Sequence, residues 1–125
     1  MVKKIMIVDD DATVAFTVKK GLEKLDKNFQ VTTVDSGFKC LEIIESGEVP
    51  DLILLDIMMP EISGWATYEK IREKKDGKEL PVVFLTARTD RIAKNAGGFL
   101  GEDYIEKPFK LPELKARIDK LLKNK

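Results

Sequence analysis

The chain has 125 residues, with 22 Lys and Arg against 22 Asp and Glu, so its formal net charge is zero. This balance argues against a general nucleic-acid binder, which needs a clear excess of cations, although it leaves a local basic face open. Hydrophobic residues make up 43% of the chain, which is enough for a core and argues against disorder. We therefore expect residues 1–125 to form one domain.

Cysteine and histidine usage excludes several kinds of site. Cys40 is the only cysteine and there is no histidine, so an internal disulfide, a Cys/His zinc site and a histidine base are all excluded. We interpret Cys40 as a small core residue of an amphipathic stretch. No apolar run is long enough to span a membrane, and the N-terminal one is too short for a signal peptide. We expect a cytoplasmic protein without membrane contact.

Strand-like and helix-like segments alternate along the chain. Short apolar runs predict strands, and apolar residues three or four positions apart predict amphipathic helices. In chain order we expect strand 4–9, helix 13–25, strand 29–34, helix 37–45, strand 52–57, helix 64–74, strand 81–87, helix 90–96, strand 104–106 and helix 111–122. Five strands that alternate with helices predict an α/β sandwich of three layers, with a parallel sheet between two layers of helices.

Polar residues stand at the carboxyl ends of four of these strands. They are Asp9 and Asp10, then Asp56, Thr86 and Lys107. Sheets of this kind bind ligands at that edge, so we expect the five side chains to lie around one crevice. Each residue alone would be an ordinary cap, strand end or surface lysine, but their coincidence on four strands predicts a joint site.

The third aspartate of the N-terminal run has a different interpretation. Asp11 stands where the first helix should begin, and Asp is a preferred residue at a helix N-cap. We therefore expect Asp11 to cap that helix rather than to bind a ligand.

The chemistry of this residue set favours a metal and a phosphoryl group. Three carboxylates in one pocket destabilise one another unless a cation joins them or one takes a proton. Oxygen ligands without His or Cys favour Mg²⁺. A metal with a nearby lysine can neutralise a phosphoryl group during transfer. Because the chain lacks His and a phosphate-binding GxxxxGK[ST] loop, a carboxylate is the expected nucleophile.

Four segments carry a resemblance to a known family. IMIVDDD, LILLDIMMPEISGW, VVFLTA and DYIEKPF occur in this order, and together they resemble the receiver domain of bacterial-type two-component response regulators. The resemblance covers nearly the whole chain. It implies a flavodoxin-like fold with strand order 2-1-3-4-5 and a phosphoacceptor signalling domain rather than an enzyme.

The resemblance also implies roles for the aspartates at the strand ends and for Met58. Asp56 matches the phosphoacceptor, which receives its phosphoryl group from a sensor histidine kinase or a phosphotransfer protein. Asp10 and Asp56 match direct Mg²⁺ ligands, Asp9 matches an acidic partner that acts largely through water, and Met58 matches a residue that supplies a backbone carbonyl ligand.

The remaining matches concern the switch. Lys107 matches the lysine that pairs with the phosphoryl oxygens, Thr86 the switch hydroxyl and Tyr104 the aromatic rotamer switch coupled to it. The bond between Lys107 and Pro108 matches one that is cis in the family. A phosphorylated receiver would act on a downstream target or output domain through the face formed by its fourth helix, fifth strand and fifth helix, or through a phosphorylation-dependent dimer, without contacting nucleic acid itself.

Two features concern the response rather than the site. Gly97 and Gly98 interrupt the fourth helix pattern, where each glycine costs about 1 kcal/mol relative to Ala, so we expect a short or mobile helix there. Met58 and Arg88 occupy positions that vary in the family and influence the lifetime of the phosphoryl group. Because the side chain of Met58 offers no donor to orient water, we expect a long-lived phosphorylated state.

Two other classes of function stay open at this point. One is an interaction module that keeps the fold without phosphorylation, which the intact set of five polar residues argues against. The other is a Mg²⁺-dependent phosphohydrolase with an aspartyl nucleophile, which would need a substrate pocket or cap that short loops leave little chain to build.

Overall fold

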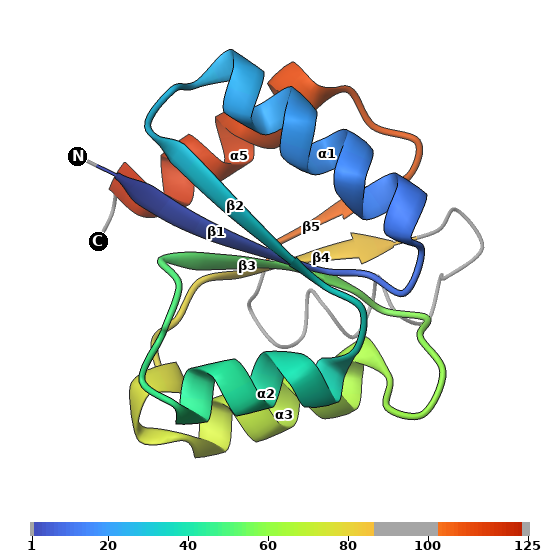
Figure 1. The fold of residues 1–125 in the computed structure, drawn as a ribbon, viewed down its shortest axis with the longest axis vertical. Helices are drawn as coiled ribbons and strands as arrows, with labels where there is room; N and C mark the ends of the chain where they lie inside the picture. The colour runs from blue at the N-terminus through green and yellow to red at the C-terminus, as the bar shows by residue number, and fades with distance from the viewer. Residues whose placement is uncertain (1, 87–102, 124–125) are drawn as a thin grey trace.

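The computed structural model describes residues 2–86 and 103–123, which form a single sheet between two layers of helices (Figure 1). Five parallel strands lie in the order β2-β1-β3-β4-β5, which confirms the predicted fold class. The strands are β1 (Lys3–Val8), β2 (Phe29–Val34), β3 (Leu52–Asp56), β4 (Val82–Thr86) and β5 (Asp103–Glu106). The helical elements are α1 (Ala12–Leu25), α2 (Gly37–Glu45), α3 (Gly64–Glu73), the 3₁₀ turn η1 (Lys75–Gly77) and α5 (Leu111–Lys123).

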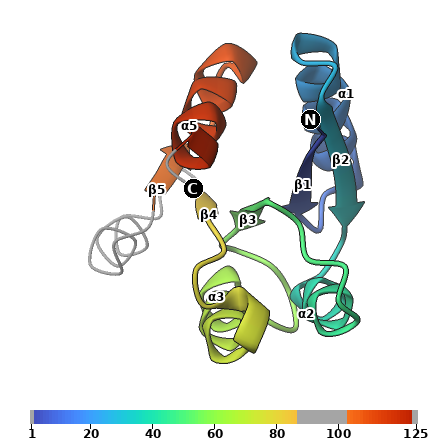
Figure 2. The ribbon, with the colours of Figure 1, turned by 90° about the vertical axis from the view of Figure 1, so that its left-hand side faces the viewer.

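The two layers of helices bury opposite faces of the sheet. Helices α1 and α5 lie on one face and α2 and α3 on the other (Figures 1 and 2). Neighbouring residues of β3 alternate between the two cores: Leu54 packs with α1 and α5, whereas Leu55 packs with α2 and α3. Because both faces are covered, β3 is buried along its whole length.

Side-chain caps define where three helices begin. Asp11 accepts hydrogen bonds from the backbone N–H groups of Thr13 and Val14, which confirms its predicted capping role. Ser36 caps α2, and Ser63 caps α3. These oxygens satisfy N–H groups that have no partner within the helix itself.

The ends of several elements differ from the predicted ones by a residue or two. Strand β1 ends at Val8 rather than Asp9, although the N–H of Asp9 still donates to the carbonyl of Val34. Helix α1 begins one residue earlier than predicted because Asp11 caps it directly. Strand β3 ends at Asp56, and the turn η1 was not predicted.

Some predictions fall outside the described residues. These are the helix at 90–96, the residues Arg88, Gly97 and Gly98, and the side chain of Thr86. Within the part of the chain that the structure describes, no helix combines the length and apolarity needed to cross a membrane.

The interpretation of Cys40 as a small core residue is confirmed, and two aromatic residues of α3 also pack against the sheet. Cys40 is buried, and burial raises the pKa of its thiol to about 12, which keeps it protonated and unreactive. The rings of Trp65 and Tyr68 on α3 pack against Phe84 of β4, with centroids 4.4 Å and 5.3 Å away. These contacts fix α3 on the sheet.

Candidate functional site

The carboxyl ends of β1, β3 and β5 bring three of the predicted residues into contact. Asp9 directly follows β1, Asp56 is the last residue of β3, and Lys107 follows β5. The Nζ atom of Lys107 lies 3.5 Å from Oδ2 of Asp9 and 3.5 Å from Oδ1 of Asp56. One lysine therefore spans two acidic groups that come from neighbouring strands.

Asp10 completes a cluster of three carboxylates. One oxygen each from Asp9, Asp10 and Asp56 lie within 4.8 Å of one another. Asp9 and Asp56 are buried, and Asp10 is exposed. Two buried carboxylates and one open to solvent form an oxygen-only donor set, which fits a hard divalent cation that keeps several water ligands.

The electrostatics of the three carboxylates also favour binding of a cation. Burial raises the pKa of the Asp56 carboxyl from 3.8 to about 6, the charge of Lys107 opposes this, and the charges of Asp9 and Asp10 add to it. A cation or a proton relieves this conflict, because either one reduces the repulsion between carboxylates held close together.

Asp11 contributes to the site in a way that sequence reasoning missed. Its side chain caps α1, and its backbone N–H donates to Oδ1 of Asp9 over 2.9 Å. This leaves Oδ2 of Asp9 for Lys107. Asp side chains commonly accept from the backbone two residues on, so an Asp two places before a helix cap was the signal for this contact.

The loop after β3 depends on a glycine. Gly64 donates its N–H to the carbonyl of Ile57 over 2.8 Å. A Cβ at position 64 would overlap the carbonyl oxygen of Asp56 and lie 2.8 Å from the Cα of Ile57. Only glycine permits this approach of α3 to the end of β3. On the same loop Met58 is 67% exposed, and Glu61 has a left-handed backbone with φ 67°.

The predicted switch residues lie on the two last strands. Thr86 is the final residue of β4, so its backbone lies at the same edge of the sheet as Asp56. Tyr104 pairs with Phe84 across the ladder and is half-buried against the core shared with α2 and α3. The peptide bond between Lys107 and Pro108 is cis, as the resemblance predicts.

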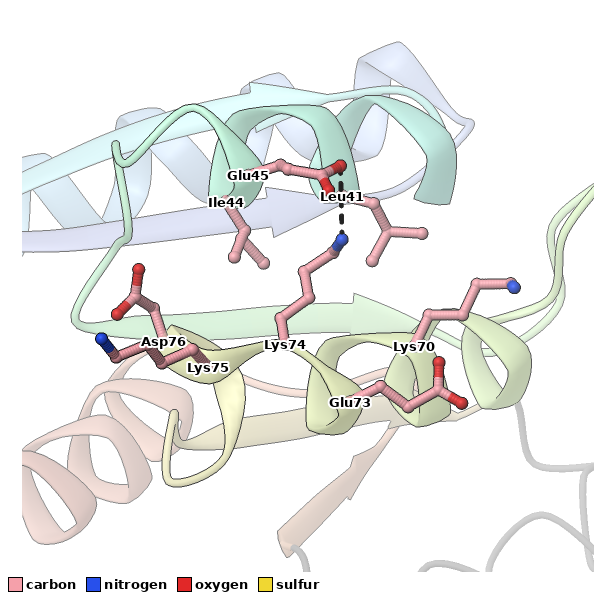
Figure 3. Close-up of a pocket in the computed structure, with 8 residues that line it drawn as sticks. All are labelled: Leu41, Ile44, Glu45, Lys70, Glu73, Lys74, Lys75 and Asp76. Carbon is pink, nitrogen blue, oxygen red and sulfur yellow. Dashed lines mark ion pairs between the residues drawn. The ribbon is translucent and has the colours of Figure 1, made fainter.

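A separate groove lies between the C-terminal halves of α2 and α3 (Figure 3). Its volume is about 490 Å³, and the ion pair between Lys74 and Glu45, 3.4 Å long, crosses it. Leu41 and Ile44 also line the groove, and none of the acidic-cluster residues does. The groove carries equal numbers of lysines and acids, so its lining selects neither an anion nor a cation.

Known proteins match nearly the whole chain. The family model described as response regulator receiver domain matches residues 5–119. The phosphate regulon transcriptional regulatory protein PhoB of Rhizobium meliloti (strain 1021) is 34% identical over 98% of this chain and 53% of its own length. The chain thus spans about half the length of the curated relatives it matches.

Solved structures agree in fold. A chain from Chloroflexus aurantiacus J-10-fl, described as a response regulator, superposes with a TM-score of 0.89 at 34% identity, covering 98% of this chain and 99% of that one. The receiver domain of a sensor histidine kinase from Pseudomonas aeruginosa PAO1, with a magnesium ion in its active-site cleft, gives 0.83 at 26% identity over 98% and 99% of the two chains. This chain therefore belongs to the family of response regulator receiver domains, the signalling domains of two-component systems.

Proposed function

We propose that Asp56 accepts a phosphoryl group and that the group shifts the conformation of the domain. The observation that carries this proposal is the contact of Lys107 with Asp56 and Asp9 inside a cluster of three carboxylates. A structural ion pair needs one acid for one lysine. A third carboxylate within 4.8 Å is instead a costly arrangement that a bound cation offsets.

The transfer itself is a substitution at phosphorus. A carboxylate oxygen of Asp56 forms the new P–O bond as the P–N bond of a phosphohistidine breaks, and the leaving imidazole keeps the electron pair. Lys107 stays beside Asp56 and neutralises negative charge on the phosphoryl oxygens.

Mg²⁺ is the cation that fits the donor set. Asp10 and Asp56 would bind it directly, Asp9 largely through water, and the backbone carbonyl of Met58 would supply a further ligand. When bound, the metal neutralises charge on the transferred group. The magnesium ion in the Pseudomonas aeruginosa receiver supports this assignment by similarity.

The response follows from the new charge. A phosphoryl group on Asp56 adds negative charge and acceptor oxygens at the end of β3, which favour the hydroxyl of Thr86 turned toward it. Tyr104, already packed against the core, follows into an inward position. The result is a shift between two populations rather than a new fold.

The partners follow from the family. A sensor histidine kinase or phosphotransfer protein would donate the phosphoryl group, and a downstream protein or output domain would receive the signal. The receiving surface would be the face of the fourth helix, β5 and α5, of which the fourth helix falls outside the described residues, and a phosphorylation-dependent dimer would use the same face. The chain spans half of relatives named as transcriptional regulatory proteins, which supports an output domain. We also propose that the domain acts in the cytoplasm.

Two rivals remain distinguishable by experiment. An unphosphorylated interaction module would have no use for the acidic cluster and would gain no mass from a phosphodonor. A phosphohydrolase would turn over small phosphate esters without accumulating phosphoprotein.

The test is intact mass after incubation with Mg²⁺ and acetyl phosphate. We expect one added phosphoryl group in the wild type and none in Asp56→Ala or in EDTA. Asp35→Ala is the matched control, because Asp35 follows the end of β2 as an exposed strand-end acid outside the cluster. Wild-type phosphorylation without Mg²⁺, or phosphorylation that survives Asp56→Ala, would overturn the assignment.

The lifetime of the phosphoryl group gives a second test. Met58 follows Asp56 by two residues and is exposed, and its side chain carries no donor, so we expect loss of the group to be faster in Met58→Asn than in the wild type. Intact mass followed over time after removal of the donor measures both rates. Equal or slower loss in Met58→Asn would contradict the expected long-lived state.

A further inference from the structure

Strand β2 forms an open edge of the sheet. It pairs with β1 on one side only. The carbonyl of Val34 accepts from Asp9 beside β1, so with the alternation of a strand the backbone groups of Phe29, Val31 and Thr33 point away from the sheet. Such a row of unpaired groups is a template for another strand.

Two side chains of α1 occupy the centre of this row. Oε2 of Glu23 accepts from the N–H of Val31 over 3.0 Å, and Nζ of Lys19 donates to the carbonyl of Val31 over 2.8 Å. Lys19 and Glu23 also form an ion pair of 3.0 Å. Both outward groups of Val31 are therefore satisfied by what we call the edge clamp, the pair Lys19–Glu23.

The neighbouring positions are only partly covered. The N–H of Phe29 donates to the carbonyl of Asp26 over 3.1 Å. For Thr33, the residues that the structure describes provide no hydrogen bond to its outward groups, and its side chain is exposed. With Val31 occupied, an incoming strand finds no two consecutive outward positions that are free.

A similar contact occurs on the opposite edge strand. Nη1 of Arg117 on α5 donates to the carbonyl of Tyr104 in β5 over 3.0 Å. Helices α1 and α5 form the same layer (Figure 2). One layer of helices therefore places a basic side chain on the backbone of each edge strand. The edge clamp differs because its acid, Glu23, also accepts the N–H group of the strand residue, Val31.

The sequence of β2 points to a second copy of this chain as the strand that would pair there. Its six residues, FQVTTV, carry no charge, glycine or proline and are rich in β-branched side chains. Two copies related by a twofold axis would pair β2 with β2 antiparallel, with Val31 close to the axis.

We propose that the β2 edge is a strand-addition surface for a second copy of this chain and that the edge clamp of Lys19 and Glu23 keeps it closed. Opening the clamp frees the N–H and carbonyl of Val31. Together with the outward groups of Thr33, they then give an incoming strand two consecutive free positions. The edge clamp shares no residue with the acidic cluster, so the proposal does not depend on phosphorylation of Asp56.

The experiment compares association of three variants without phosphodonor. Lys19→Met with Glu23→Leu opens the clamp. Lys39→Met with Asp35→Leu removes another pair of the same spacing, which contacts no outward group of β2, and introduces the same apolar side chains. A third variant adds Thr33→Pro to the opened clamp, because proline is tolerated where an edge N–H faces solvent and blocks strand pairing.

Sedimentation velocity over a concentration series is the measurement. We expect the opened-clamp variant to move toward twice the monomer mass as concentration rises, whereas the control pair behaves as the wild type and Thr33→Pro restores wild-type behaviour. An opened-clamp variant that sediments as the wild type, or association that survives Thr33→Pro, would overturn the proposal.

A milder variant keeps the test decisive if the double substitution unfolds. Glu23→Gln keeps an acceptor for Val31 but loses the ion pair, and circular dichroism checks its fold. We expect faster hydrogen exchange of the Val31 amide in dilute Glu23→Gln, with protection returning at high concentration. Wild-type exchange at every concentration would contradict a closing role for the clamp.

Discussion

At the scale of single residues, Asp56 stands under opposing influences. It is 8% exposed and lies beside two other carboxylates, which raise its pKa, and beside Lys107, which lowers it. Its pKa of about 6 means that the folded protein without metal holds a proton on Asp56 under mildly acidic conditions, where the unfolded chain has lost it. Asp56 therefore links folding to pH.

The sign of this linkage gives a prediction for metal-free protein. Between about pH 4 and pH 6 Asp56 binds more protons in the folded state than in the unfolded state, so its contribution to the free energy of unfolding falls as pH rises through this window. Asp56→Asn carries no buried negative charge, so we expect it to be more stable than the wild type above pH 6, by on the order of 1–3 kcal/mol. The difference between the two proteins should disappear below about pH 4. Urea unfolding in EDTA across this range measures it.

The control uses an acid whose pKa moves the other way. Asp35 is exposed, and its hydrogen bond and charge interaction with Lys39 lower its pKa, so Asp35→Asn should not stabilise the protein. A stability gain in both variants, or a pH-independent difference for Asp56→Asn, would show that burial of the Asp56 charge is not the cause.

At the scale of elements, the three consecutive aspartates that precede helix α1 have different roles. Asp9 and Asp10 join the cluster, and Asp11 caps the helix while its N–H holds Asp9. The first turn of α1 contains no acidic residue, so the cap is the feature that favours its N-terminus. The start of α1 and the placement of Asp9 thus depend on one residue.

Substitutions of Asp11 separate these roles. Asp11→Ala removes the acceptor for Thr13 and Val14 and is expected to lower the free energy of unfolding by about 1 kcal/mol, whereas Asp11→Asn keeps it and should stay within a few tenths of a kcal/mol. Urea denaturation gives both values. Mg²⁺ titrations followed by Trp65 fluorescence should show unchanged affinity in Asp11→Asn and weaker affinity in Asp10→Asn. A larger loss of affinity in Asp11→Asn would make the third aspartate a ligand.

At the scale of the whole molecule, the two cores meet at β3. Leu54 and Leu55 are neighbours in sequence and fully buried, yet they contact different layers of helices. Because β3 pairs with β1 and β4, it joins both cores to the centre of the sheet. The domain should therefore unfold as one unit.

Cavity substitutions test this unity. Leu54→Ala and Leu55→Ala are each expected to lower the free energy of unfolding by about 2–5 kcal/mol, because each leaves a hole in a packed core. Trp65 fluorescence and far-ultraviolet circular dichroism should give coincident transitions in both variants. Leu25→Ala, at a side chain 45% exposed, is the control and should change stability by no more than about 0.5 kcal/mol. Separate transitions in Leu54→Ala would mean that the layer of α1 and α5 unfolds by itself.

The sequence determined the alternation of strands and helices and the placement of acids at strand ends. Both follow from local patterns: apolar runs, helical spacing and the residue that comes after each strand. The capping role of Asp11 and the packing role of Cys40 were predictable for the same reason. Strand ends were predicted less accurately, because whether Asp9 or Ile57 continues a strand depends on how the loop beyond it turns.

The tertiary structure alone decided which of these groups touch. Lys107 and Asp9 are 98 positions apart, and their 3.5 Å contact exists only because β1, β3 and β5 end at one edge of the sheet. The raised pKa of Asp56 and the clamp of α1 on Val31 likewise depend on packing between segments distant in sequence. A local pattern gives the side chains available for such contacts, and the distances between them follow only from the packing of helices on the sheet.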